Sequence, residues 1–214
     1  MIDETTQRQA VVAAVQRLDA LGLNRGSTGN VSVRQGAGML ITPTGSGADV
    51  QPEDLAWVGW DGTRRGPWQP SSEWHFHQAV YLARPERMAV VHTHSTHATA
   101  LACLRRPLPA FHYMVAVAGG DTVPLVPYFT FGTEALSQAV AHALHDRLAC
   151  LLANHGLVAA GATLAQAMKV MLEIESLCEA YLVALAVGEP VLLGADDMAE
   201  VISQFRGYGQ TARR

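Results

Sequence analysis

Residues 88–94 read Met-Ala-Val-Val-His-Thr-His, an apolar run that ends in two histidines one residue apart. The apolar run predicts a strand in the core. Because successive strand side chains point to opposite faces, His92 and His94 share one face, roughly 6–7 Å apart. Two imidazoles placed in this way can converge on a divalent metal, whereas without one their buried nitrogens would lack partners. The alternative is a pair of surface histidines where the strand emerges.

A second apolar run, residues 148–153, leads into Asn154-His155-Gly156. The end of a buried strand is where α/β proteins place functional groups, and glycine lets the backbone pass close to a ligand. A lone histidine there is more often a hydrogen-bonded structural residue. As a third ligand beside His92 and His94, His155 would complete a site that keeps a fourth position open, as catalytic zinc requires.

Ser71-Ser72-Glu73 opens a predicted helix that ends near Pro85. Free backbone N–H groups, the two hydroxyls and the positive end of the helix dipole suit a phosphate, and Glu73 would reach the metal or act as a base. The alternative is an ordinary helix cap with an acidic first turn. Residues 26–30 and 42–45 are further loops of glycine and hydroxyl residues that can wrap a phosphate with backbone amides. Neither has a Walker or dinucleotide-binding spacing, so no nucleotide cofactor is indicated.

Strands and helices are predicted to interleave without strict βαβ order, which indicates one α/β/α layered domain over residues 1–214 on a mixed sheet. The expected strands are residues 31–34, 39–42, 55–60, 88–94, 111–117, 122–128 and 148–153, and a short one that ends at 160. The expected helices are residues 11–21, 71–85, 96–104, 133–145, 163–188 and 196–205, with Thr133 and Thr163 as caps of the fourth and fifth.

The composition indicates a globular cytoplasmic protein. Apolar residues make up 49% of the 214 residues and charged residues 16%, the net charge is −4, and no stripe of Lys or Arg is present, so nucleic acid and anionic membranes are not expected partners. The N-terminus lacks the charged and apolar blocks of a secretory signal, and no run is apolar enough for a membrane helix. Cys103, Cys150 and Cys178 show no CxxC spacing and are expected to be buried, reduced thiols.

Other histidines and carboxylates receive structural interpretations. His75, His77, His142 and His145 are expected to be structural or solvated, and His112 to orient Tyr113. The spacing of His92, His94 and His97 has a superficial likeness to metallo-β-lactamase-type hydrolases, but their pattern needs an aspartate where Thr96 stands. Residues Glu173, Glu175 and Glu179 are expected on the solvated or subunit-facing side of the longest helix.

Taken together, the chain resembles the class II aldolase/adducin family, most closely its L-fuculose-1-phosphate aldolase branch. The resemblance rests on the order and spacing of motifs along nearly the whole chain. These are Gly29-Asn30-Val31-Ser32-Val33-Arg34, Ile41-Thr42-Pro43-Thr44-Gly45, Ser71-Ser72-Glu73, His92-Thr93-His94, His112-Tyr113-Met114, Gly119-Gly120, Pro127-Tyr128 and Asn154-His155-Gly156-Leu157.

The resemblance implies a largely antiparallel sheet and one Zn²⁺ per subunit, with Mn²⁺ or Co²⁺ as alternatives. His92, His94 and His155 would hold the metal, with Glu73 on or near it. The implied phosphate site comprises Ser27, Asn30, Thr44, Gly45, Ser71 and Ser72. Tyr113 would act in a neighbouring subunit of a homotetramer, while Phe131 and Tyr208, the latter in a mobile tail at about 205–214, would line the substrate pocket.

The implied reaction is reversible cleavage of a ketose 1-phosphate into dihydroxyacetone phosphate and a small aldehyde such as lactaldehyde. Lys169 is the only lysine and lies within the longest predicted helix, so a Schiff-base mechanism has almost no candidate. Alternatives are a 5-deoxyribulose or 5-methylthioribulose 1-phosphate salvage aldolase of the same branch, and a pentulose-phosphate 4-epimerase or decarboxylase of the same family. Against an epimerase stands Glu73, where those enzymes usually carry Asp, and against a decarboxylase stands Ser71-Ser72, where those typically carry Thr-Lys. A non-catalytic, adducin-like scaffold lacks the metal ligands that this chain carries.

Overall fold

The computed structural model describes residues 3–207, with side chains up to residue 205. Eight strands form one sheet in the order β4-β3-β2-β1-β5-β8-β7-β6. They are β1 (Asn30–Gln35), β2 (Gly38–Ile41), β3 (Ala56–Gly59), β4 (Arg64–Arg65), β5 (Ala89–Thr93), β6 (Leu125–Val126), β7 (Ala149–Leu152) and β8 (Gly156–Gly161). Only β6 and β7 pair in parallel, and every other neighbouring pair is antiparallel. The predicted mixed, largely antiparallel sheet is therefore confirmed.

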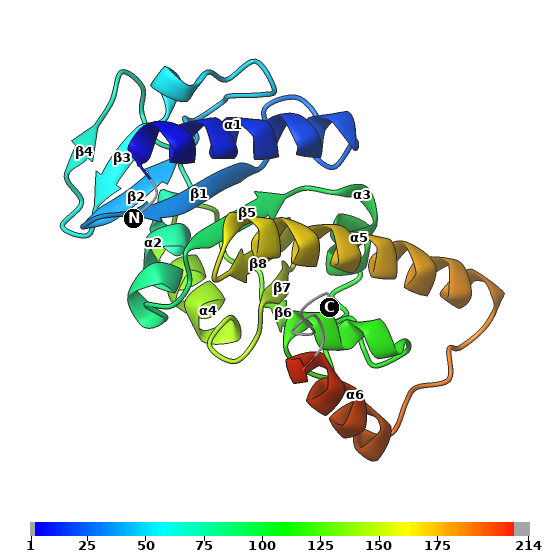
Figure 1. The fold of residues 1–214 in the computed structure, drawn as a ribbon. Coiled ribbons are helices and arrows are strands. Elements are labelled where there is room, and N and C mark those ends of the chain that lie inside the picture. The colour runs from blue at the N-terminus through cyan, green and yellow to red at the C-terminus, as the bar shows by residue number, and fades with distance from the viewer. Residues whose placement is uncertain (1–2, 208–214) are drawn as a thin grey trace, which may run out of the picture.

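Helices cover both faces of this sheet (Figure 1). They are α1 (Glu4–Ala20), α2 (Trp74–Ala83), α3 (Thr96–Cys103), α4 (Glu134–Ala143), α5 (Leu164–Val187) and α6 (Ala195–Gly207), with 3₁₀ turns η1 (Pro52–Asp54) and η2 (Tyr113–Ala118). Helices α1, α3 and α5 lie on one face and α2 and α4 on the other, which confirms the predicted three layers. No helix in the described part of the chain is long and apolar enough to cross a membrane.

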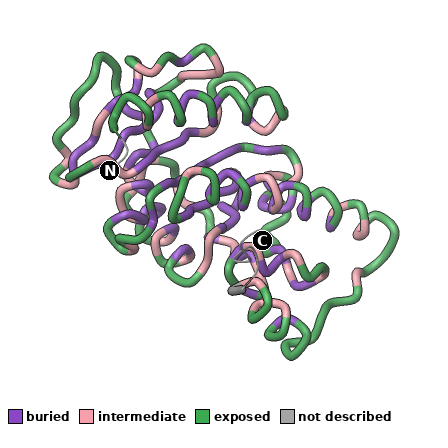
Figure 2. The backbone as a smooth tube through the Cα atoms, in the orientation of Figure 1, coloured by how far each residue is buried: buried purple, intermediate pink, exposed green. Residues whose placement is uncertain are grey.

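Alternation along the strands supplies both faces with apolar side chains. In β7, Leu151 belongs to the core under α1, α3 and α5, while its neighbours Cys150 and Leu152 belong to the core under α2 and α4. This follows from the two-residue period of a strand. In Figure 2 the central strands are almost continuously buried, and the exposed segments lie on the outer helices, the loops and the edge strand β4. The central strands are thus held from both sides.

Local signals placed most helices correctly. Thr133 and Thr163 cap α4 and α5 as predicted, because their side-chain oxygens accept hydrogen bonds from the backbone N–H groups of Leu136 and Gln166. Helix α2 begins at Trp74 rather than at the two serines, so Glu73 occupies the capping position just before the helix instead of its first turn.

The strand predicted over residues 111–117 is wrong. The segment forms η2, which His112 caps by accepting a hydrogen bond from the backbone N–H of Met114 and which ends at Gly119, whose φ is +86°. Buried residues of η2 such as Val115 pack in the α5 core, so tertiary packing outweighed the strand propensity of the apolar run.

The strand predicted over residues 122–128 shrinks to β6, which has two residues. Pro124 and Pro127 flank it, and neither can donate a ladder hydrogen bond. Cys150 and Cys178 are buried as expected, but Cys103 is exposed because it lies in the last turn of α3. The predicted tail at about 205–214 lies outside the described residues except for its first positions, which belong to α6.

Leu151→Ala should lower the free energy of unfolding by about 2–5 kcal/mol, since the side chain is completely buried and its loss leaves a cavity. Urea unfolding followed by circular dichroism measures the change. Leu82→Ala on α2, where the side chain is 55% exposed, is the matched control and should stay within about 0.5 kcal/mol of the parent. Equal effects of the two substitutions would contradict this assignment of the core.

Candidate active site

Three separate parts of the chain bring a His/Glu cluster together. His92 lies in β5, His94 directly follows it, His155 lies in the turn between β7 and β8, and Glu73 precedes α2. One ligand atom from each of these residues lies within 4.8 Å of the others. The antiparallel register that pairs Thr93 with Leu157 places the β7–β8 turn beside the end of β5, which is why His155 meets His94 and His92, 61 and 63 positions earlier in the chain.

The three imidazoles are arranged around a common point. Their ring centroids are 4.8–4.9 Å apart and each pair of rings is nearly perpendicular, with interplanar angles of 73–79°. Nδ1 of His92 lies 2.9 Å from the carbonyl oxygen of Leu157, so this nitrogen carries the proton and Nε2 keeps its lone pair. That Nε2 lies 3.0 Å from Nε2 of His94. A carbonyl partner on the outer nitrogen is the arrangement found for metal-bound histidines.

Glu73 completes the cluster as a carboxylate. Its Oε1 lies 3.1 Å from Nε2 of His155 and its Oε2 lies 3.3 Å from Nε2 of His92. Burial alone would raise the pKa of Glu73, but His92 and His155 outweigh that effect and hold the pKa well below its usual range. Burial, reinforced by His92, lowers the pKa of His94 to about 4. An ionised carboxylate and a neutral imidazole are the forms that bind a metal.

The donor set fits a divalent metal. Oε1 of Glu73 is buried without a hydrogen-bond partner, since its contact with His155 does not have hydrogen-bond geometry. An unsatisfied buried carboxylate oxygen is costly unless a cation or donor reaches it. Three imidazole nitrogens and one carboxylate are a donor set that zinc accepts, and two of the four residues are completely or almost completely buried.

A buried chain of side chains orients Glu73. Asn30 Nδ2 donates to Oε2 of Glu73 (2.9 Å), and Asn30 Oδ1 accepts from Nε2 of His77. Nδ1 of His77 therefore accepts from the Ser32 hydroxyl (2.7 Å), which in turn accepts from the Tyr81 hydroxyl (2.8 Å). Burial lowers the pKa of His77 to about 3, which keeps its ring neutral. His77 is therefore structural, one of the two roles expected for it, and its link to Glu73 through Asn30 has no signal in the sequence.

A cavity of about 320 Å³ opens beside the cluster. All of the predicted phosphate-site residues line it: Ser27, Asn30, Thr44, Gly45, Ser71 and Ser72. Glu73, His94, His155 and the predicted pocket residue Phe131 line it as well, together with Tyr128 and Asn154, whose contribution the sequence analysis did not recognise although both lie in its motifs. The structure thus brings three of the four expected metal-site residues, Glu73, His94 and His155, to one cavity with the expected phosphate loops, while His92 is buried behind them.

Backbone contacts hold two of the phosphate loops against each other. Pro43 and Pro70 form a bridge, the N–H of Ser71 donates to the carbonyl of Thr42 (3.0 Å), and the N–H of Thr44 donates to Gln69 (3.0 Å). These contacts fix the position of the Thr44 and Ser71 hydroxyls at the cavity.

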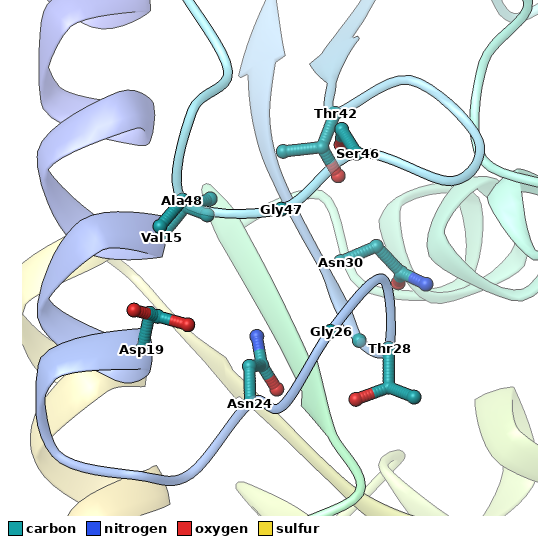
Figure 3. A pocket seen from close by; sticks show the side chains of 11 residues that line it. Val15, Asp19, Asn24, Gly26, Thr28, Asn30, Thr42, Ser46, Gly47 and Ala48 are labelled. Atoms are coloured by element: carbon teal, nitrogen blue, oxygen red, sulfur yellow. The ribbon is translucent and has the colours of Figure 1, made fainter.

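The third loop depends on Gly29. Its φ is +76°, and a Cβ there would lie 2.6 Å from the His92 carbonyl oxygen and 2.4 Å from Oδ1 of Asn24. Only glycine fits between the strand that carries His92 and the Asn24 amide. Asn24 is buried behind this loop and lines a cavity of about 10 Å³ next to α1, the volume of about one water molecule (Figure 3).

Two predicted residues do not reach the cavity of their own chain. Tyr113 is half exposed in η2, stacks on the His112 ring, and is not among the residues that line the cavity. Its predicted role in a neighbouring subunit stays a prediction. Tyr208 lies outside the described residues.

Glu175 is not solvated, contrary to expectation. It is 7% exposed on α5, and its carboxylate accepts from the Ser95 hydroxyl (2.7 Å) and from the backbone N–H groups of His97 and Ala98 (2.9 Å each). These groups form the N-terminus of α3, where a negative charge is stabilised by the helix dipole. Glu175 therefore secures the helix that starts two residues after His94.

Comparisons with known proteins agree with this geometry. Residues 9–182 match the family model described as the class II aldolase and adducin N-terminal domain. A 5-methylthioribulose-1-phosphate/5-deoxyribulose-1-phosphate aldolase of Rhodospirillum rubrum is 48% identical over 207 residues, 96% of this chain and 94% of that protein. An L-fuculose phosphate aldolase of Escherichia coli (strain CFT073) is 45% identical over 201 residues, 93% of this chain and 94% of that protein.

A solved structure of an L-fuculose 1-phosphate aldolase superposes with a TM-score of 0.89 at 37% identity, covering 93% of this chain and 95% of the other. The chain therefore belongs to the class II aldolase and adducin family, as its motifs indicated. It is an enzyme, a lyase of the class II aldolase type, and its His/Glu cluster can hold the divalent metal that this class uses.

Gly156→Ala should lower both the stability and the affinity for a divalent metal, because a Cβ at this position would lie 2.3 Å from the Thr93 carbonyl oxygen and 3.1 Å from the His94 ring. Overpacking of this kind costs about 1–3 kcal/mol, and disturbed ligand support lowers metal affinity about tenfold or more. Urea unfolding and chelator competition measure the two effects.

Gly188→Ala is the matched control for this substitution, since a Cβ at Gly188 would meet nothing within 4 Å and the backbone there is extended. If Gly156→Ala behaved like Gly188→Ala in both measurements, the close approach at Gly156 would not support the cluster.

Proposed function

We propose that this enzyme is a zinc-dependent aldolase that reversibly cleaves a ketose 1-phosphate into dihydroxyacetone phosphate and a small aldehyde. The observation that carries the proposal is one cavity of about 320 Å³, which is lined both by three residues of the His/Glu cluster (Glu73, His94 and His155) and by the three hydroxyl- and glycine-rich loops. A substrate with a phosphate at one end and a carbonyl next to it needs both kinds of group within one small volume.

The metal is assigned to His92, His94 and His155, with Glu73 as the fourth protein group near it. Zinc bound there would supply a Lewis acid that polarises the substrate carbonyl and lowers the cost of the negative charge that develops on it. The neutral His94 imidazole and the ionised Glu73 carboxylate described above support this assignment.

The phosphate is assigned to the loops on the other side of the cavity. Ser27, Thr44, Ser71 and Ser72 offer hydroxyl groups, and the backbone at Gly45, with φ +70°, lets N–H groups turn towards an anion. Among the described residues that line the cavity, none is Lys or Arg, so recognition would rest on hydroxyl and N–H donors. Asn30 lies between the proposed metal site and the proposed phosphate site, since it lines the cavity while its amide donates to Glu73.

The carbon–carbon cleavage requires two proton movements. As the C3–C4 bond breaks, its electron pair passes to C3. The C4 hydroxyl gives up its proton, and we assign the uptake of this proton to Tyr113 of a neighbouring subunit. The Glu73 carboxylate takes up a proton from solvent and gives it to C3, while the proton held by Tyr113 returns to solvent; in the synthetic direction the Glu73 carboxylate removes the C3 proton. The exposure of Tyr113 supports a role outside its own chain and, with it, the proposed homotetramer.

The aldehyde half of the substrate would lie near Phe131, which is 63% exposed at the cavity, and near Tyr208. An aromatic surface suits the apolar tail of lactaldehyde from L-fuculose 1-phosphate. It suits equally the tails of the aldehydes from 5-deoxyribulose and 5-methylthioribulose 1-phosphate. Cleavage of these two sugars is the second candidate function, and the 48% identity to the Rhodospirillum rubrum aldolase supports it.

Removal of the metal should abolish cleavage. The chelated enzyme and His92→Ala should both lose zinc. For each of them, kcat/KM for release of dihydroxyacetone phosphate should fall at least about a thousandfold with L-fuculose, 5-deoxyribulose and 5-methylthioribulose 1-phosphate. Added zinc should restore the chelated enzyme but not the variant. His145→Ala, at an exposed site on the surface, is the control and should keep full activity. Undiminished turnover without metal would exclude this mechanism, and a ketose product without dihydroxyacetone phosphate would indicate an epimerase.

Glu73→Gln should keep zinc on the three histidines and lose the exchange of the C3 proton of dihydroxyacetone phosphate with solvent by about 10²–10⁴-fold, because the amide cannot take up that proton. Proton NMR in D₂O measures the exchange in the absence of any aldehyde. Glu134→Gln, in the exposed first turn of α4, is the matched control. Exchange at the parent rate in Glu73→Gln would remove Glu73 from the proton transfer.

A further inference from the structure

Helix α3 ends in a conformation that normally selects glycine. Its capping residue is Leu104. The N–H of Arg105 donates to the carbonyl of Ala102 (3.0 Å), and the N–H of Arg106 donates to the carbonyl of Leu101 (3.5 Å). This pair of bonds is the Schellman arrangement, whose left-handed residue is usually glycine. Here that residue is Arg105, with φ +53°, so a long side chain occupies a backbone conformation that its Cβ disfavours.

In the described part of the chain, two residues that are not glycine have a left-handed backbone: Arg105, and a second one in the turn that carries His155. Asn154 has φ +55°, and the N–H of His155 donates to the carbonyl of Leu152 (3.0 Å) across the turn. A turn of this kind needs a positive φ at its third residue, for which Asn is the best choice after Gly. Asn154 also lines the active-site cavity, directly before a proposed metal ligand.

These two strained residues are bonded to each other. Nε of Arg105 donates to Oδ1 of Asn154 (3.1 Å), and the N–H of Asn154 donates to the carbonyl of Ala102 (3.2 Å), the same oxygen that accepts from the N–H of Arg105. The end of α3 and the β7–β8 turn are therefore joined through a side chain and through a shared backbone oxygen.

We propose that Arg105 is a positioning residue of the active site: through Asn154 it holds the turn that aims His155 at the metal. The inference rests on the proposed metal role of His155. Strained backbone conformations persist where the surrounding structure requires them, and they gather at functional sites. A glycine at position 105 would relieve the strain but could not reach Asn154, so the presence of Arg105 indicates that the side-chain contact is needed.

The next residues explain why the position of this turn matters. Gly156 passes so close to the Thr93 carbonyl and to the rings of His92 and His94 that the backbone after His155 has no free space on that side. The turn is exposed on its other side, at Asn154, where Arg105 is the hydrogen-bonding partner of the side chain. Loss of that contact would leave the outer half of the turn free to move His155 relative to the cluster.

Arg105→Gly tests the proposal through two measurements that do not depend on catalysis. We expect zinc affinity, measured by chelator competition, to fall about tenfold, as for loss of other groups that orient metal ligands. The midpoint of urea unfolding should stay unchanged or rise, since glycine relieves the left-handed backbone. Asn154→Gly should weaken zinc binding to a similar extent, and the double variant should bind no more weakly than the weaker single variant.

Arg106→Ala is the matched control, because it removes a neighbouring exposed charge and leaves both turns intact; it should bind zinc like the parent. Parent-like zinc affinity in Arg105→Gly, a parallel loss of affinity and stability, or an equal loss in Arg106→Ala would each overturn the proposal. A parent protein that binds zinc without aldolase activity would overturn only the proposed reaction. A parent protein without zinc affinity would overturn the metal site and this inference together.

Discussion

The register between β5 and β8 is the constraint on which the active site depends. Pairing of Thr93 with Leu157 brings the β7–β8 turn to the end of β5, so that His155 faces His92 and His94. A shift of one residue would turn every side chain of β5 to the opposite face of the sheet. Val90 and Val91 are completely buried in different cores, so such a shift would also exchange the contents of both cores. The apolar layers therefore hold the histidines in place.

Buried carboxylates are the second recurring feature of the molecule. Glu73 and Glu175 are each 7% exposed, and each contacts polar groups from elsewhere in the chain. For Glu73 these are the Asn30 amide, which donates to it and which His77 orients in turn, and the imidazoles of His92 and His155, which lie 3.3 and 3.1 Å from its oxygens. For Glu175 they are the N–H groups that begin α3. Because a buried charge is tolerated only when it is well paired, both carboxylates fix the conformation of the groups around them. In both cases those groups lie next to residues of the His/Glu cluster.

Sequence patterns predicted the parts of the fold that local chemistry decides. Apolar runs such as residues 148–153 and the threonine caps of α4 and α5 depend on neighbouring residues alone, and they were placed correctly. The segment at 111–117 was not, because an apolar run of this length suits a strand or a buried 3₁₀ turn, and packing against α5 decides between them. The prediction that Cys103 is buried was wrong for a related reason: the apolar residues around it do not show which side of α3 faces solvent, and helix packing decides this.

The sequence by itself indicated the fold class, the four residues of the His/Glu cluster and the loops that line the cavity, because residue type and spacing within short motifs carry that information. Only the tertiary structure decided the partners of those residues. The Asn30 amide reaches Glu73 across 43 positions, the Ser95 hydroxyl reaches Glu175 across 80, and Arg105 reaches Asn154 across 49. Such contacts follow from strand register and helix packing, which depend on the chain as a whole, and no local period encodes them.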